Sequence, residues 1–158
     1  MNRAAQWSIC RVAAAVLVGA GLLGSTLPAV AQTAQQAIAF RKGAMQVQLW
    51  YGRILTQMIK GTRPWDSAQY LRIVSILDQS VVSSTVDGFI PGSDTGDTRA
   101  LPVIWSDAAG FRAALERFQA ESAKALTVGK SGDEKAMRAQ AVEVLRACDS
   151  CHERYRAK

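Results

Sequence analysis

Two cysteines and the only histidine of the sequence stand together near the C-terminus, in the segment RACDSCHERYRAK. Cys148 and Cys151 are three residues apart, and His152 follows directly. On a helix, this spacing places both thiols on one face about one turn apart, with the imidazole rotated by one further residue. Thiols and imidazoles bind metals, form disulfides and act as nucleophiles. The segment is therefore the first candidate for chemistry in this chain.

Three interpretations of the cysteine pair find little support in the surrounding sequence. A thioredoxin-like dithiol belongs at the N-terminus of a helix that follows a strand, whereas Cys148 lies near the C-terminal end of its predicted helix. A zinc site needs four ligands, and beyond Cys10 the chain offers only two Cys, one His and carboxylates. A disulfide between residues one helical turn apart closes a very short loop and stabilises little.

The fourth interpretation is covalent attachment of haem, for which C-x-x-C-H is the typical signature. Two thiols on one helical turn can form thioethers to one side of a porphyrin, and the adjacent imidazole can then bind the iron from below. The sequence therefore favours one haem c held by Cys148 and Cys151, with His152 as the proximal iron ligand.

The first 31 residues have the pattern of a secretory signal peptide. Basic Arg3 and Arg11 accompany an apolar run over residues 12–27, and residues 29–31 form an A-x-A exit. The run has 16 residues, fewer than the roughly 20 of a spanning helix, which makes an uncleaved membrane anchor the weaker alternative. We expect residues 1–31 to be removed and the protein to be periplasmic.

The remaining residues, 32–158, are expected to form one domain that does not attach to the membrane. The whole chain has 19 basic and 13 acidic residues, and without Arg3 and Arg11 the basic count is 17, which gives a net charge of +4. The basic residues are scattered, so the sequence does not indicate nucleic-acid binding. A mild positive charge instead affects which redox partner proteins the domain associates with.

Helical periodicity dominates residues 32–158. Apolar residues recur at steps of three, four and seven within 34–60, and Asp66 begins a second helix with a capping-box pattern. Residues 85–104 are rich in Gly, Pro, Asp and Thr and predict a long crossover. Ser106 and Ser131 are expected to cap the third and fourth helices. The pattern predicts an all-α protein, an antiparallel four-helix bundle with one long crossover between helices 2 and 3.

Several positions predicted to face inward carry small side chains. A bundle filled only by side chains favours larger residues there, so the pattern suggests space for a group that is not protein. From the residue pattern alone, close approach of helices through alanine is the favoured explanation. These small inward residues are Ala37, Ala44, Ser122, Ala125 and Ala141.

The sequence resembles the class II c-type cytochromes, the family of cytochrome c′ and cytochrome c-556. The segment CDSCHERYR near the C-terminus resembles the attachment motif of that family, and FRKGAMQ resembles its first helix. KGTRPWDSAQ is similar to its turn into the second helix, and FIPGSDTGDTRALPVIWSDAAGF to its crossover and third-helix start. The resemblance covers the whole mature chain and implies a four-helix haem protein.

The resemblance also implies haem contacts outside the motif. Arg41 matches an arginine near a haem propionate, Lys42 beside it matches a haem contact, and Arg156 matches a basic residue close to the proximal ligand. Phe89 and Asp97 fall where the family places contacts from the crossover. From the residues alone, the basic side chains could equally be solvated helix charges, Phe89 core and Asp97 a turn former.

Met45 lies four residues after Arg41, at the position that faces the distal side of the iron in the family. A thioether ligand there would give six-coordinate iron, a raised reduction potential and electron transfer, as in cytochrome c-556. Methionine packed over the iron without bonding would leave a five-coordinate cytochrome c′. As a flexible core filler, it would have no role at the iron.

The expected function is single-electron transfer through Fe(II)/Fe(III) with redox partner proteins. The alternative is binding of nitric oxide or carbon monoxide at five-coordinate iron, for scavenging or sensing. An enzyme is not expected, because the sequence shows no nucleophile–base pair, phosphate loop or carboxylate pair at a motif spacing. Many members of the family pair through their first two helices, so a homodimer is a further expectation.

Overall fold

The computed structural model describes residues 32–84 and 86–158, and the predicted signal peptide over 1–31 lies outside this part. Helices are the only regular elements of the described chain, which contains no strand and only one isolated bridge, between Ala100 and Arg156. Its helices are α1 (Ala34–Ile59), α2 (Ser67–Ser84), the short α3 (Val103–Ser106), α4 (Ala108–Gly129) and α5 (Glu134–Tyr155).

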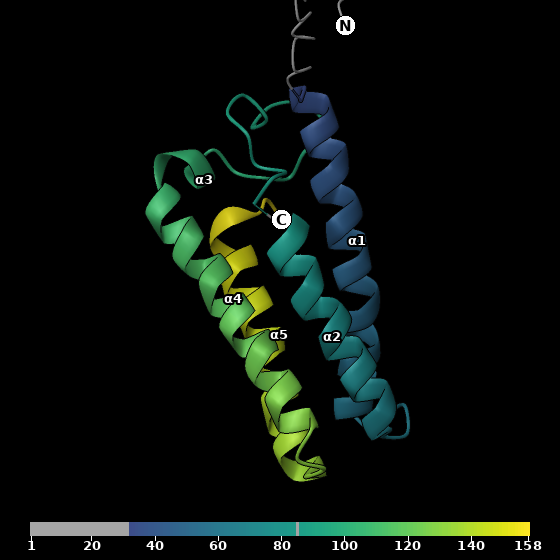
Figure 1. Cartoon of the computed structure of the whole chain (residues 1–158). Coiled ribbons are helices and arrows are strands. Elements are labelled where there is room, and N and C mark those ends of the chain that lie inside the picture. Colours follow the sequence, from purple (N-terminus) through teal and green to yellow (C-terminus); the bar gives the residue numbers. More distant parts are fainter. Residues whose placement is uncertain (1–31, 85) are drawn as a thin grey trace, which may run out of the picture. The chain divides into compact units, whose positions relative to one another are not determined.

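The four long helices form an antiparallel bundle. Helix α4 packs along α5 and α2, and α1 packs against α2, while α1 and α5 make fewer contacts (Figure 1). Short turns join α1 to α2 and α4 to α5, whereas the crossover from α2 to α3 runs over one end of the bundle. The predicted all-α four-helix bundle is confirmed. In the described part, no helix combines the length and the apolar character that crossing a membrane requires.

Side-chain caps fix where the long helices begin. Thr33 and Gln36 form a reciprocal capping box at α1, and Asp66 accepts a hydrogen bond from the Gln69 backbone N–H at α2. Two predicted caps are wrong by one or two residues, because in each case a nearby aspartate takes the position. Asp107 caps α4 after Ser106 has ended α3, and Asp133 rather than Ser131 caps α5.

The crossover is shorter than predicted because its last residues, from Val103, already form α3. Its end is fastened to the C-terminus by backbone hydrogen bonds from Leu101 N–H to the Tyr155 carbonyl and from Ala157 N–H to the Arg99 carbonyl. These bonds hold the crossover beside the last turn of α5, next to the cysteine motif.

The hydrophobic core of the described residues consists of two separate clusters. The larger cluster fills the middle and the far end of the bundle, where Leu55, Met58 and Tyr70 are fully buried. The smaller cluster lies below the crossover and contains Ile104, Phe111, Leu115 and Tyr155. The core is therefore interrupted along the length of α5.

The small inward residues serve close helix packing over most of the bundle. Ala125 and Ala141 are fully buried in the larger cluster, as expected where helix backbones approach one another. Ala37 is fully buried next to Gly88 of the crossover, and Ser122 is fully buried with a hydroxyl that has no hydrogen-bond partner in the described structure. Ala44 is the exception, since it is only partly buried. Among the five small inward residues, only Ala44 is thus not fully buried.

Asp107 joins the start of α4 to the end of α5. Its carboxylate accepts a hydrogen bond from the Tyr155 hydroxyl (3.0 Å), forms an ion pair with Arg154 (2.7 Å) and accepts one from the Gly110 backbone N–H (3.2 Å). The hydrogen bonds from Tyr155 and Gly110 lower the pKa of the carboxyl below its usual 3.8, and burial opposes them.

We expect Asp107→Asn to lower the melting temperature at neutral pH and to reduce the acid sensitivity of the fold. Because the carboxyl has a lowered pKa in the folded state, its contribution is complete above the ordinary pKa of 3.8 and disappears as the pH falls through the lower, folded value. Thermal unfolding between pH 2 and 7 measures this. Glu143→Gln, which removes an exposed ion pair with Arg146, is the control and should leave the pH dependence unchanged.

Candidate functional site

The cysteine motif occupies the last two turns of α5. Cys148, Cys151 and His152 are each partly buried, and both thiols are free. Cys148 packs against the larger hydrophobic cluster and Cys151 against the smaller one. The two thiols therefore lie at the interruption between the clusters, on the face that α5 turns into the bundle.

The thiols are not activated for redox chemistry. Burial raises the pKa of Cys148 to about 12, with smaller contributions from Asp149 and Cys151, and burial also raises the pKa of Cys151. A thioredoxin-like dithiol needs a lowered thiol pKa, so the structure gives that interpretation no support. Among the described residues, no group of three or more His, Cys, Asp or Glu side chains is placed to hold a metal ion by itself.

His152 is held in a form that can bind a metal. Burial lowers the pKa of its imidazole, and the positive charge of Arg156 lowers it further, while Asp149 opposes both. The ring makes no hydrogen bond within the described part of the chain. A neutral imidazole with a free nitrogen is the form that coordinates iron.

Met45 comes level with the motif across the bundle. Near the other end, the Arg138 guanidinium donates to the Met58 carbonyl (3.1 Å), and Gly52 faces Leu145. Because α1 and α5 run antiparallel with the same rise per residue, going back seven residues from Gly52 reaches the level of Cys151 and His152. That position on α1 is Met45, which is partly buried.

The inner face of α1 is incompletely covered at this level. Within the described structure, no residue of α1 between Arg41 and Leu55 is fully buried, although Ala44, Gln48 and Tyr51 continue its inward stripe. This stretch lies opposite the two thiols of α5. The donor set, the interrupted core and the uncovered face of α1 together fit a flat group such as haem between α1 and α5.

Arg41 is 3% exposed and is bonded to the crossover. Its Nη1 donates to the Gly88 carbonyl (2.8 Å) and Ser93 Oγ (2.7 Å), and its Nη2 donates to the Ser93 carbonyl (2.5 Å) and Thr98 Oγ1 (2.6 Å). These bonds use all four hydrogens of the terminal nitrogens, so only Nε–H stays available for the predicted propionate contact.

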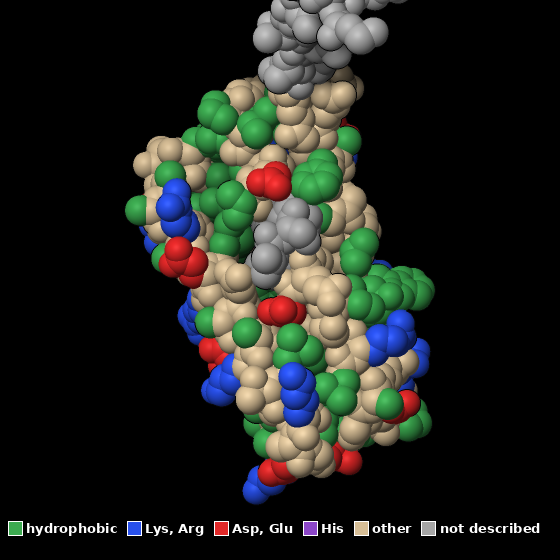
Figure 2. Space-filling view, in the orientation of Figure 1, with side chains coloured by type: hydrophobic (Ala, Val, Ile, Leu, Met, Phe, Trp, Pro, Cys, Tyr) green, Lys and Arg blue, Asp and Glu red, His purple; other side chains and the backbone are tan. Residues whose placement is uncertain are grey.

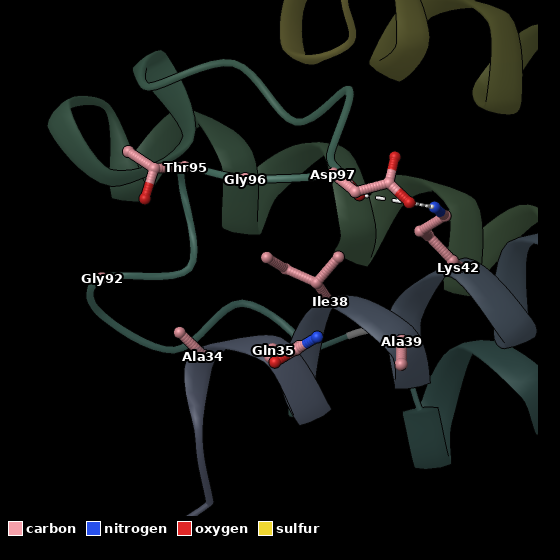
Figure 3. Close-up of a pocket in the computed structure, with 9 residues that line it drawn as sticks. All are labelled: Ala34, Gln35, Ile38, Ala39, Lys42, Gly92, Thr95, Gly96 and Asp97. Atoms are coloured by element: carbon pink, nitrogen blue, oxygen red, sulfur yellow. Dashed lines mark hydrogen bonds and ion pairs between the residues drawn. The ribbon is translucent and has the colours of Figure 1, made fainter.

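Lys42 and Asp97 meet at the edge of a pocket between α1 and the crossover. Their side chains form an exposed ion pair of 2.5 Å (Figure 3). The pocket, of about 550 Å³, is lined by Ala34, Gln35, Ile38, Ala39, Lys42, Gly92, Thr95, Gly96 and Asp97. It contains neither thiol of the motif. The predicted haem contacts of Lys42 and Asp97 stay predictions.

Phe89 packs against the smaller cluster, and Arg156 follows directly after Tyr155 of that cluster. The Phe89 ring packs edge-on against Phe111 (4.8 Å between centroids), and Phe111 packs against Tyr155 in the same way (5.2 Å). The Arg156 backbone N–H caps α5 by donating to the His152 carbonyl. Two aromatic contacts thus connect Phe89 to Tyr155, three residues after His152. Arg156 lies one helical turn after His152.

Sequence reasoning missed three residues that organise this end of the protein. Ser93 is fully buried in the crossover, Trp105 donates its indole N–H to the Ile90 carbonyl (3.2 Å), and Thr98 accepts from Arg41. A serine or threonine in a loop has many possible partners, so the sequence offered no signal for these roles. Trp105 stood inside the quoted crossover segment but was given no contact.

Comparison with known proteins identifies the family. A profile described as Cytochrome C′ matches residues 36–156. Cytochrome c′ from Rubrivivax gelatinosus is 35% identical over 127 residues, which cover 77% of this chain and 95% of that protein. Among solved structures, cytochrome c prime from Shewanella frigidimarina has a TM-score of 0.77 at 28% identity, covering 81% of this chain and 99% of the other. The nitric oxide complex of a cytochrome c prime mutant from Alcaligenes xylosoxidans has a TM-score of 0.72 at 31% identity, with 81% and 98% covered.

These similarities and the motif define a class II c-type cytochrome. The chain belongs to the cytochrome c′ family. Its cofactor is accordingly one haem c, attached covalently through Cys148 and Cys151.

Proposed function

We propose that this protein is a periplasmic cytochrome that exchanges single electrons with redox partner proteins. The observation that carries the proposal is the partial exposure of Cys148, Cys151 and His152. A haem held there has an edge close to the surface, where a partner protein can approach it. The residues around the motif supply no nucleophile–base pair, so the protein is proposed to be a carrier rather than an enzyme.

The chain's own residues have three tasks in this proposal. The two cysteines keep the cofactor attached, and His152 offers a neutral imidazole nitrogen to one side of the iron. Met45, level with His152 across the bundle, offers either a thioether ligand or an apolar cover on the other side. The bound haem would supply the one-electron Fe(II)/Fe(III) couple, and a thioether ligand from Met45 in addition to His152 would raise its potential.

Binding of a small gas molecule is the second candidate function. It is favoured by the relative from Alcaligenes xylosoxidans, which was solved as a nitric oxide complex. It is also favoured by the partly buried Met45 and Ala44, which would give the distal side an apolar lining. In that case Met45 packs over the iron without bonding, and only small uncharged ligands such as nitric oxide or carbon monoxide enter.

The absorption spectrum of the exported protein tests Met45. We expect a low-spin spectrum with a sulfur-to-iron charge-transfer band, and we expect Met45→Leu to remove that band because leucine offers no ligand. Leucine has a similar volume, so packing should change little. A high-spin spectrum that changes when nitric oxide is added, and that is the same in Met45→Leu, would instead establish the second function and exclude thioether ligation.

Export is part of the proposal, since covalent haem attachment would be completed outside the cytoplasm. Cleavage after Ala31 would leave a mature chain that begins at Gln32. The mass of the protein recovered from a periplasmic extract measures this directly. A mass that still includes residues 1–31 would contradict it.

A homodimer through α1 is proposed as the assembled form. Phe40, Val47 and Trp50 share one face of α1 and are 41%, 43% and 64% exposed. Hydrophobic side chains stand out along this edge of the bundle in Figure 2. An exposed apolar row on a long helix is typical of a surface that pairs with another protein, and a second copy presents the same row.

We expect Trp50→Lys to convert the dimer to a monomer, because each subunit would bring a charge into an apolar contact. Light scattering after size-exclusion chromatography measures the mass. Thr127→Lys adds the same charge on an exposed position of α4 and should leave the dimer intact. A wild-type protein that is monomeric at high concentration would contradict the proposal.

A further inference from the structure

Arg41 makes an unusual set of contacts for a residue on a helix that is otherwise exposed at this level. Its guanidinium is buried, yet its four terminal hydrogen bonds go to carbonyl and hydroxyl oxygens rather than to a carboxylate. Burial lowers the pKa of this arginine, and the charge of Asp94 partly opposes that effect. These four hydrogen bonds offset the free-energy cost of burying the charge, because the planar guanidinium can donate to several acceptors of the crossover at once.

The contacts leave little freedom between α1 and the crossover. The guanidinium lies 4.9 Å from the centroid of the Phe89 ring and 5.8 Å from that of Trp105. At Gly88 the loop backbone comes so close that an added Cβ would lie 2.6 Å from the Cβ of Arg41. Only glycine permits this approach.

The acceptors are themselves fixed. Ser93 is fully buried and donates its hydroxyl hydrogen to the Ile90 carbonyl (2.7 Å), so its oxygen is oriented to accept from Arg41. Thr98 Oγ1 accepts from the Ala100 backbone N–H (3.1 Å) as well as from Arg41. Arg41 thus binds to a loop whose acceptor groups are held in place by other hydrogen bonds. We call its bonds to Gly88, Ser93 and Thr98 the Arg41 clamp.

We propose that Arg41 is a positioning residue, whose clamp on Gly88, Ser93 and Thr98 sets how closely α1 approaches the distal face of the haem. The proposal rests on the proposed function, in which the haem lies between α1 and α5. Met45 is one helical turn from Arg41, so a shift of α1 at Arg41 moves Met45 as well.

The clamp can act in this way because the crossover is also tied to α5. Past Thr98 it is tied to the end of α5 by the backbone bonds of Leu101 and Ala157 to Tyr155 and Arg99. The clamp therefore connects the helix that carries Met45 to the helix that carries His152, around the side of the site. Helices α1 and α5 make fewer direct contacts with each other than α4 makes with α5 or α2.

The experiment compares Arg41→Lys and Ser93→Ala with wild type in the mature haem-containing protein. Lysine keeps the charge but loses the fork, and Ser93→Ala keeps the guanidinium but removes one acceptor. We expect amide hydrogen exchange at Phe89 and Ser93 to become about tenfold faster in Arg41→Lys and less so in Ser93→Ala, because bonds to a charged donor are lost. The association rate of carbon monoxide with the reduced protein should rise in the same order.

Arg138→Lys is the matched control. Arg138 also lies over a tryptophan ring (4.3 Å from Trp65) and donates to a carbonyl, but at the far end of the bundle. The Arg138→Lys substitution should lower the stability of the fold without changing carbon monoxide binding or amide hydrogen exchange in the crossover. Unchanged carbon monoxide binding in both Arg41→Lys and Ser93→Ala, with faster exchange, would overturn the inference. Failure of the proposed function would be visible separately, as a wild-type haem protein that does not exchange electrons with redox partners.

Discussion

Replacing Cys148 and Cys151 together with serine is expected to abolish covalent haem attachment. Serine has nearly the same shape but forms no thioether, and both thiols lie at the interruption between the two hydrophobic clusters. The mass of the recovered double variant should equal that of the polypeptide alone, and any haem that stays with it should be extracted by acidified organic solvent. The wild-type protein should keep its haem under the same treatment.

Single substitutions sharpen this prediction. Cys148→Ser and Cys151→Ser each leave one thiol, so either protein should carry at most one thioether link and a different reduced spectrum. Ser150→Ala lies between the cysteines and keeps both thiols, and it is expected to attach haem normally. Haem that stays covalently bound to the double variant would contradict the assignment of the two cysteines.

The parts of this site that could be predicted from the sequence are local ones. The relative positions of Cys148, Cys151 and His152 follow from their spacing and the period of the α-helix, and both can be read from neighbouring residues. The same holds for the predicted helix start at Asp66, where the side chain and the Gln69 backbone N–H three residues later suffice. The caps at Ser106 and Ser131 were wrong because Asp107 and Asp133 offered the same chemistry nearby, and only packing decides between such neighbours.

The parts that could not be predicted depend on residues far apart in the chain. The partners of Arg41 in the crossover are between 47 and 57 residues away, and nothing in the local pattern selects them. The family resemblance suggested a propionate contact for Arg41, but it could not indicate that four of the five hydrogens on its guanidinium nitrogens are given to the protein. That distribution follows from the close approach at Gly88, which is a property of the folded crossover.

Small inward residues show a similar limit. Ala125 and Ala141 allow close helix contact, whereas Ala44 borders uncovered space, and the three look alike in the sequence. What separates them is the interruption of the core along α5, which emerges only when the helices are assembled. The sequence therefore could not tell which small inward residue serves close packing and which borders uncovered space.

His152→Ala is expected to remove the proximal nitrogen while both thioethers still form. The imidazole is partly buried, burial and Arg156 keep it neutral, and its ring makes no hydrogen bond in the described structure, so no other side chain replaces it directly. We expect the reduced spectrum to lose the features of a histidine-bound haem. The substitution also leaves a space the size of an imidazole ring beside the attachment site.

Added imidazole should then restore those features, because the free ligand fits the space that the substitution creates. Titration of the His152→Ala protein with imidazole, followed by absorption, measures this rescue. Arg156→Gln, one helical turn further on, keeps the ligand and is expected to need no imidazole. A His152→Ala protein whose spectrum matches wild type, before any imidazole is added, would show that the iron takes its proximal ligand from elsewhere in the chain.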